Sequence, residues 1–216
     1  MSAPPDRPMI YHLTHIENLL SILEQGCIWS DAECVRQKLR HKNVGMNDIK
    51  RRRLESIEVQ CHSGTKVGEY VPFYFCPRSV MLYLLHQSNH PDLDYNEGQG
   101  EIIHLESDLQ SVIDSANVTK RQWAFSATNG GAYYTQFYND IRCLDQINWE
   151  SVHAFDWSAA EVKEGKQAEF LLYGSFPWKL VERIGVREGT MRERVELALE
   201  GAKHIPIVSA QPDWYY

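Results

Sequence analysis

The sequence predicts an α+β fold with a mainly antiparallel sheet, and three observations support this. Short apolar and aromatic segments typical of strands are mixed with helical segments, without the regular strand–helix alternation of parallel sheets. The 216 residues are 43% hydrophobic and 24% charged, which is enough apolar surface for a folded core. No linker rich in Pro, Gly or Ser and no internal repeat divides the sequence, so we expect one domain over residues 1–216.

The first elements are a strand and a helix. Apolar and aromatic residues at 8–15 predict the strand. Thr14 and Glu17 have the spacing of an N-terminal capping box, and apolar residues repeat at helical spacing after them. Gly26 then supplies the stop that ends the helix.

Strands and helices continue to the end of the chain. Further strands are predicted at 27–30, 70–79 (ended by Pro77), 100–107, 122–129 and 168–178. Helices are predicted within 78–89, 107–117 and 191–204, the second begun by a Ser or Asp cap. Residues 31–60 are expected to be mostly helix or loop, and 130–140 a loop or helix start.

Composition and motifs exclude several classes of protein. The longest apolar run, at 80–85, is too short to span a bilayer, and the first ten residues lack the features of a signal peptide, so we expect a cytoplasmic protein. Five cysteines without a CxxC pair favour reduced thiols and predict no metal site. The sequence contains no dinucleotide-binding GxGxxG after a strand, no P-loop and no GxSxG elbow.

Residues 36–53 concentrate positive charge. They contain eight Lys or Arg and one acidic residue, a net charge of +7, whereas the whole chain carries −7 and the remainder therefore −14. Such a contrast suggests an anionic partner at one face. A solvated helix face would give the same pattern, so charge alone leaves both readings open.

Four segments together carry a resemblance to a known family. "YHLTHIENLLSIL", "NVGMNDIKRRR", "VPFYFCPRSVMLYLL" and "QAEFLL", spread in this order over residues 11–172, resemble the DarT family of DNA ADP-ribosyltransferase toxins. The resemblance implies an ADP-ribosyltransferase fold, with two packed, mainly antiparallel sheets and flanking helices around a cleft for NAD. It also implies transfer of ADP-ribose from NAD to a base in single-stranded DNA, thymidine in most members, which a macrodomain antitoxin reverses.

The resemblance implies a site built from three strands. It places a His on the first strand, an aromatic on a middle strand and a Glu on a late strand, and His12, Tyr74 and Glu169 match these positions. Breaking the nicotinamide–ribose bond creates positive charge on the ribose, which a carboxylate stabilises, more strongly where the dielectric is low. Without the resemblance, Glu169 would be read as an exposed carboxylate at a strand end and His12 equally well as a buried, hydrogen-bonded filler.

Other residues are implied to bind the cofactor. Leu13 and Thr14 are implied to offer backbone groups to the nicotinamide amide. Asn18 and Ser21 lie on the helix that passes the cleft and are implied to contact the cofactor. Simple exposure of Asn18 and Ser21 to solvent is an equally good alternative. Tyr74 is expected to stack on the nicotinamide ring.

The basic segment at 36–53 is implied to bind NAD, with one essential arginine that Arg51 matches. A guanidinium can hold a pyrophosphate with two hydrogen bonds; a role as proton acceptor is hard to reconcile with a group that stays protonated. We therefore expect Arg51 to be both catalytic and cofactor-binding, and Gly45 to let the loop approach the cofactor closely. The remaining cations, expected to contact DNA phosphates, are Lys50, Arg52 and Arg53.

Residues 119–169 are expected to recognise the substrate. Aromatic residues among polar ones are suited to base stacking, although several must belong to the core, and Tyr133 and Tyr134 beside Gly130 are the expected exposed pair. The open alternatives are an enzyme of the same fold that modifies guanosine in DNA, RNA or protein, and a non-catalytic nucleic-acid-binding module.

Overall fold

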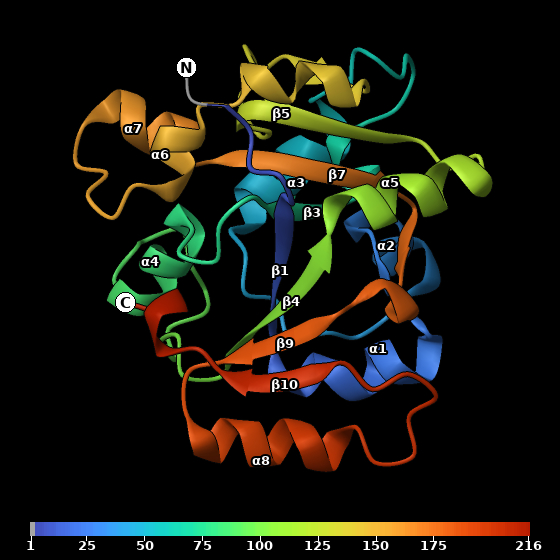
Figure 1. Ribbon diagram of the computed structural model, residues 1–216, viewed down its shortest axis with the longest axis vertical. Helices are drawn as coiled ribbons and strands as arrows, with labels where there is room; N and C mark the ends of the chain where they lie inside the picture. The colour runs from blue at the N-terminus through green and yellow to red at the C-terminus, as the bar shows by residue number, and fades with distance from the viewer. Residues whose placement is uncertain (1–2) are drawn as a thin grey trace.

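The computed structural model describes residues 3–216 and shows the predicted mixture of strands and helices (Figure 1). The strands are β1 (Met9–His15), β2 (Cys27–Trp29), β3 (Tyr70–Tyr74), β4 (Ile102–Asp108), β5 (Trp123–Asn129), β6 (Phe137–Tyr138), β7 (Ala168–Tyr173), β8 (Ser175–Pro177), β9 (Arg183–Val186) and β10 (Ile207–Ala210). The α-helices are α1 (Leu19–Gln25), α2 (Asp31–Gln37), α3 (Asn47–Glu55), α4 (Val80–Gln87), α5 (Leu109–Val118), α6 (Trp149–His153), α7 (Ala160–Gly165) and α8 (Gly189–Ala198).

One large sheet organises the fold. Its eight strands lie in the order β10-β9-β4-β1-β3-β7-β5-β6, and every pair is antiparallel except β9 with β10. The second sheet is small and consists of β2 and β8 alone. The predicted α+β fold with mainly antiparallel strands is confirmed, with the strands divided unequally between the two sheets.

The large sheet brings distant parts of the sequence together at its centre. β3 pairs with β1 through Tyr74 and Tyr11, and with β7 through Tyr74 and Glu169. His12, next to Tyr11, therefore lies on a strand two removed from Glu169. The three strands expected to carry the site are neighbours in the sheet.

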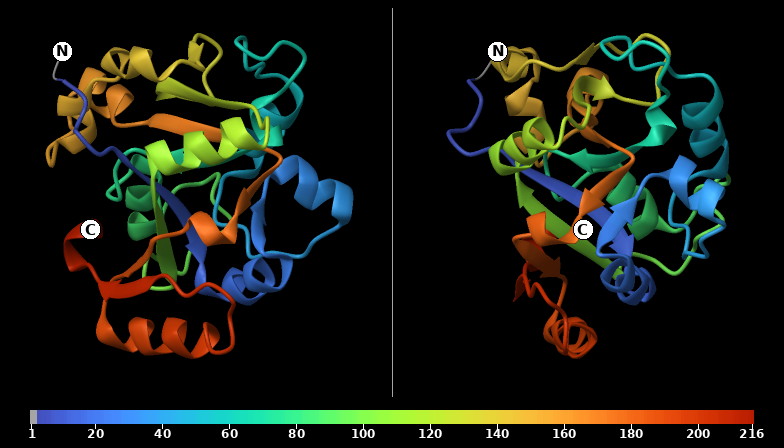
Figure 2. Two further views of the ribbon diagram at one scale, coloured as in Figure 1. Left: turned by 45° about the vertical axis from the view of Figure 1, so that its right-hand side comes forward. Right: turned by 90° about the vertical axis from the view of Figure 1, so that its right-hand side faces the viewer.

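The helices lie around the sheet at its faces and ends. α8 lies beyond β10 at one end of the molecule, and α6 and α7 lie at the other end (Figures 1 and 2). α2 and α3 lie together on one side (Figure 2), joined by an ion pair between Asp31 and Lys50 with Nζ and Oδ1 2.9 Å apart. Within residues 3–216, the model has no helix with the length and apolar character needed to cross a membrane.

The helix after β1 does not begin as the sequence predicts. β1 continues to His15, whose Nδ1 accepts a hydrogen bond from the backbone N–H of Glu17 at 3.2 Å. Thr14 is still paired with Ile103 in the sheet, and its hydroxyl oxygen accepts from Asn18 Nδ2 instead of capping the helix. The expected capping box of Thr14 and Glu17 is therefore wrong, because Thr14 remains part of the strand. The predicted helix end is confirmed, since Gly26 has a left-handed φ of 67°.

The segment expected to form one strand at 168–178 forms two. Gly174 has φ +73°, a conformation that other residues adopt only with strain, and it separates β7 from β8. β7 stays in the large sheet, while β8 turns away and pairs with β2. This break leaves Glu169 on the inner strand.

Candidate active site

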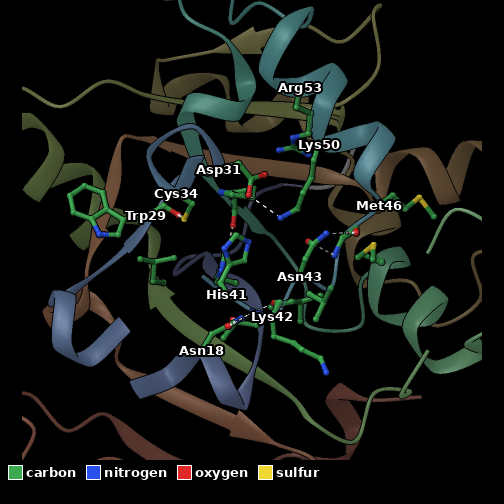
Figure 3. Close-up of a pocket in the computed structure, with 18 of the residues that line it drawn as sticks. Asn18, Trp29, Asp31, Cys34, His41, Lys42, Asn43, Met46, Lys50 and Arg53 are labelled. Carbon is green, nitrogen blue, oxygen red and sulfur yellow. Dashed lines mark hydrogen bonds and ion pairs between the residues drawn. The ribbon is translucent and has the colours of Figure 1, made fainter. Parts of the chain in front are cut away.

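A cleft lies between β1, β3 and β7 on one side and α1, α2, α4 and the 38–46 segment on the other (Figure 3). Most of the predicted site residues line it. They are His12, Leu13, Thr14, Asn18, Ser21, Gly45, Lys50, Arg53, Tyr74 and Glu169. Four predicted residues do not: Arg51, Arg52, Tyr133 and Tyr134.

Glu169 and Arg53 form a buried ion pair at one end of the cleft. Arg53 donates from Nη1 to Oε1 at 3.1 Å and from Nη2 to Oε2 at 2.7 Å, and the side chains are 12% and 3% exposed. Burial alone would lower the pKa of Arg53, but the charge and hydrogen bonds of Glu169 outweigh it and the pKa is raised. The site therefore holds the Glu169 carboxyl group out of water, joined through both of its oxygens to a guanidinium.

Tyr74 lies beside this pair, directly opposite Glu169 in the sheet register. Burial, followed by the charge of Glu169, raises the pKa of Tyr74 far above its usual range, so the phenol is neutral. The loop after β5 approaches from another side, where a side chain at Gly130 would place its Cβ 3.3 Å from Glu169 Oε2. Little space remains around the carboxylate.

His12 is partly buried and has a defined tautomer. Its Nδ1 lies 2.8 Å from the carbonyl oxygen of Pro72, which only accepts, so Nδ1 carries the hydrogen and Nε2 is left as an acceptor. Burial lowers the pKa of His12. A neutral imidazole with a free acceptor is suited to a ribose hydroxyl.

Asn18 and Gly45 lie at the cleft, but their contacts are with protein. Both hydrogens of the Asn18 amide are used, by Thr14 Oγ1 and by the carbonyl of Lys42. A Cβ at Gly45 would lie 2.9 Å from Cε of Lys50, so the Lys50 side chain passes close to the backbone here.

Arg51 lies away from the cleft. Its side chain is 67% exposed and pairs with Asp48, one turn earlier on α3, at 2.8 Å. Successive residues of a helix point about 100° apart, so Arg51 and Arg53 face different directions, and only Arg53 reaches Glu169. The arrangement expected for Arg51 is thus not found, and the position inside the cleft belongs to Arg53, which was assigned to DNA.

The remaining cations and the exposed tyrosines lie near the Glu169 end. Arg52 places its guanidinium over the ring of Tyr133, 5.6 Å from the ring centre, and its buried Nε has no hydrogen-bond partner within the described residues 3–216. Tyr133 and Tyr134 are 70% and 72% exposed, so the structure agrees with their expected exposure. Lys50, which lines the cleft, is held by Asp31.

Sequence reasoning missed several lining residues. Trp29, Cys34 and His41 also line the cleft (Figure 3), and burial raises the pKa of Cys34 to about 11, which leaves a protonated thiol. Asn129 and Gln167, joined by a hydrogen bond of 2.9 Å, line the cleft near Glu169. No motif singles out these residues; only the fold brings them together.

Candidate metal ligands are scattered. Across residues 3–216, no three His, Cys, Asp or Glu side chains are grouped in a way that could hold a metal ion.

Curated relatives resemble this chain over nearly its full length. A Thermus aquaticus protein named DNA ADP-ribosyl transferase is 36% identical over 99% of this chain and 91% of its own. A second, from Thermus sp. (strain 2.9), is 34% identical over 98% of both chains, and one from Mycobacterium tuberculosis is 26% identical. A Thermosipho africanus protein named as a fusion of DNA ADP-ribosyl transferase and DNA ADP-ribosyl glycohydrolase is 41% identical over 35% of this chain and 19% of its own.

Solved structures agree with these relatives. Thermus sp. 2.9 DarT in complex with ADP-ribosylated single-stranded DNA superposes with a TM-score of 0.89 at 32% identity, covering 100% of this chain and 99% of the other. The same protein in complex with NAD+ gives a TM-score of 0.79 at 31% identity, covering 99% and 100%. The family model described as "ssDNA thymidine ADP-ribosyltransferase, DarT" matches residues 11–216. With a cleft that ends in a buried carboxylate, this chain belongs to the DarT family of NAD-dependent DNA ADP-ribosyltransferases.

Proposed function

We propose that this protein transfers ADP-ribose from NAD to thymidine in single-stranded DNA, as the toxin of a toxin–antitoxin system. The observation that supports this most directly is the buried Glu169 carboxylate at the end of a cleft lined by His12 and Tyr74. An exposed aromatic loop lies next to that end, through Gly130 beside Glu169 and Tyr133 farther along. The cleft proposed for NAD thus ends where the surface proposed for DNA begins.

The reaction follows from charge. The bond between nicotinamide and C1′ of the ribose breaks, nicotinamide leaves with the bonding electrons, and the ribose becomes positively charged. The Glu169 carboxylate opposes that charge, and its burial strengthens the attraction. A ring nitrogen of the base then bonds to C1′ and gives up its proton to solvent water. The neutral His12 holds the ribose by accepting a hydroxyl hydrogen at Nε2.

Arg53 takes the role first expected of Arg51. Its guanidinium holds both oxygens of Glu169 and so fixes the rotamer of the carboxylate that faces the ribose. We assign Arg53 to the reacting centre and Arg51 to the outer surface.

DNA is bound beside the Glu169 end, in this proposal. Tyr133 and Tyr134 offer exposed rings for base stacking, and Arg52, whose guanidinium lies over the ring of Tyr133, offers a positive charge to a phosphate. Five of the eight cations at 36–53 are already paired with acidic residues. They are Arg36, Lys42, Lys50, Arg51 and Arg53. Binding should therefore be local and moderate in strength.

A macrodomain antitoxin that removes the ADP-ribose is part of the proposal. It is supported by the relative whose name joins a DNA ADP-ribosyl transferase to a DNA ADP-ribosyl glycohydrolase. A cytoplasmic location, expected from the sequence, is also part of the proposal.

Mass spectrometry of a mixed-sequence, single-stranded oligonucleotide incubated with the protein and NAD tests the proposal. We expect a gain of one ADP-ribose unit that fragmentation places on thymidine, and no gain on an oligonucleotide without thymidine. Modification of guanosine would keep the enzyme and change the base, whereas binding without any mass change would leave a non-catalytic module.

A further inference from the structure

The 38–46 segment between α2 and α3 forms one wall of the cleft without belonging to a helix or strand. Every residue from Leu39 to Met46 lines the cleft. In the described chain, residues 3–216, the backbone of residues 40–44 makes hydrogen bonds at Lys42 alone. Besides the packing of Val44 and the burial of Met46, the middle of this wall is therefore held by very few hydrogen bonds.

Asn18 provides both of those contacts. Its Oδ1 accepts from the N–H of Lys42 at 2.7 Å, and its Nδ2 donates to the carbonyl of Lys42 at 3.0 Å (Figure 3). The second hydrogen of Nδ2 goes to Oγ1 of Thr14 at 3.1 Å, and Thr14 is buried and paired within the large sheet. The amide thus joins the wall to the sheet, pairing with the Lys42 peptide as a neighbouring strand would.

Other restraints on the segment are different in kind. Lys42 Nζ pairs with Glu97 at 2.5 Å through side chains that are 32% and 47% exposed, where solvent weakens the attraction. The amide of Asn43 bonds with Gly45 and Asn47, which shapes the local turn and attaches the segment to α3 only. Asn18 is the link between the middle of the wall and β1.

We propose that Asn18 is a positioning residue, which holds the 38–46 segment in the conformation that binds NAD and acts through the Lys42 peptide instead of touching the cofactor. Both of its donor hydrogens are committed to protein, which leaves it little to offer a ligand. If the segment is released, only a fraction of molecules present a complete wall, and the affinity for NAD falls by that fraction. Only the identity of the ligand, NAD, rests on the proposed function.

Hydrogen exchange of the ligand-free protein, read by mass spectrometry, tests the inference without NAD or DNA. Asn18→Ala should speed exchange of the hydrogen-bonded amides of the segment, at Leu39, Lys42 and Gly45, whereas Ser21→Ala should not, because within residues 3–216 the Ser21 side chain forms no hydrogen bond. Asn18→Asp keeps the acceptor for the Lys42 N–H but loses both donors, so it should give an intermediate rate. In the transfer reaction, Asn18→Ala should raise the KM for NAD about tenfold and leave kcat within about twofold of the original value.

Two results would overturn the inference. Unchanged exchange in ligand-free Asn18→Ala, with a raised KM, would show that Asn18 contacts NAD directly. Faster exchange with an unchanged KM would show that the wall's position does not matter for binding. Because exchange is measured without substrates, it stays informative even if the protein proves to modify a different base or none.

Discussion

At the scale of single residues, the ion pair between Glu169 and Arg53 determines what the cleft can do. Both side chains are almost fully buried, and the guanidinium meets both carboxylate oxygens. Removing one partner of a buried pair leaves the other charge without compensation, which typically costs about 3–5 kcal/mol. The pair is therefore expected to matter for stability as well as for chemistry.

The two arginines of α3 that lie two positions apart should behave differently on substitution. Arg53→Ala should lower the rate of ADP-ribose transfer at least about a hundredfold, because the carboxylate loses the group that fixes its rotamer and charge. Arg51→Ala should keep the rate within about threefold, because Arg51 meets only the exposed Asp48 and surface pairs contribute little. Initial rates on one oligonucleotide, measured for variants that unfold cooperatively, make the comparison.

Arg53→Lys serves as the control for charge alone, since it keeps a cation but loses the two-pronged hydrogen bonding. It should retain part of the rate and most of the stability. If Arg51→Ala were inactive while Arg53→Ala stayed active, the assignment made from the family resemblance would be correct and the present one would be wrong.

The difference between these arginines shows what the sequence could not supply. The run at 50–53 offers four cations, and nothing in their spacing marks the one that faces inward. α3 has no buried residue that would reveal its inner face, so the direction of each side chain depends on how the helix meets β7. His12, Tyr74 and Glu169 were indicated by the family resemblance alone, and the pairing of β1, β3 and β7 then places them on neighbouring strands.

At the scale of elements, the loop between β5 and β6 links the cleft to the surface. Gly130 lies against Glu169, and three residues later Tyr133 is 70% exposed above Arg52. The loop thus leads from the Glu169 carboxylate to an exposed aromatic side chain beside Arg52.

Tyr133→Ala should raise KM for single-stranded DNA about tenfold, because stacking of one base on an aromatic ring contributes about 1–3 kcal/mol. Tyr133→Phe keeps the ring and should stay within about twofold. Phe155→Ala is the matched control, since Phe155 is 77% exposed but does not line the cleft. Steady-state kinetics with saturating NAD measure all three, and an equal effect of Tyr133→Ala and Phe155→Ala would remove Tyr133 from the DNA site.

Most elements were predictable from local pattern, and the errors have local causes. Helices α4, α5 and α8 appear where spacing and caps predict, with Asp108 capping α5 as expected, whereas β9 and β10 were not predicted and β3 ends at Tyr74, before Pro77. The change of sheet at Gly174 was not predictable, because "AEFLLYGSFPW" is apolar on both sides of the glycine. Only the pairing of β8 with β2 shows that β7 and β8 are separate strands.

At the scale of the whole molecule, buried histidines make stability depend on pH. His104 lies within the core, where its Nε2 meets the carbonyl of Pro77 at 3.0 Å and its Nδ1 has no partner in the described chain (residues 3–216). Burial lowers the pKa of His104 to about 4. Below about pH 6.5 the unfolded chain takes up a proton that the folded protein refuses, so stability falls as pH falls from about 6.5 toward 4.

His104→Gln removes this titration and can keep the donor to Pro77. We expect the free energy of unfolding of the unsubstituted protein to fall by up to about 1.4 kcal/mol more per pH unit than that of His104→Gln between pH 6 and 5. Denaturant unfolding at three pH values measures the two slopes. Parallel slopes would mean that His104 is not held neutral in the fold.

The central claim is that the buried carboxylate of Glu169 drives ADP-ribose transfer, and a single-turnover experiment with Glu169→Gln tests it most directly. The substitution keeps the shape of the side chain and removes the charge that opposes the ribose cation. We predict that the variant, with NAD binding confirmed by calorimetry, transfers ADP-ribose to single-stranded DNA at least about a hundredfold more slowly at saturating NAD. The loss of the ion pair with Arg53 should also lower the melting temperature of the variant, so the rate is measured at a temperature well below that value. A folded, NAD-bound Glu169→Gln protein that transfers within about threefold of the original rate would contradict the account.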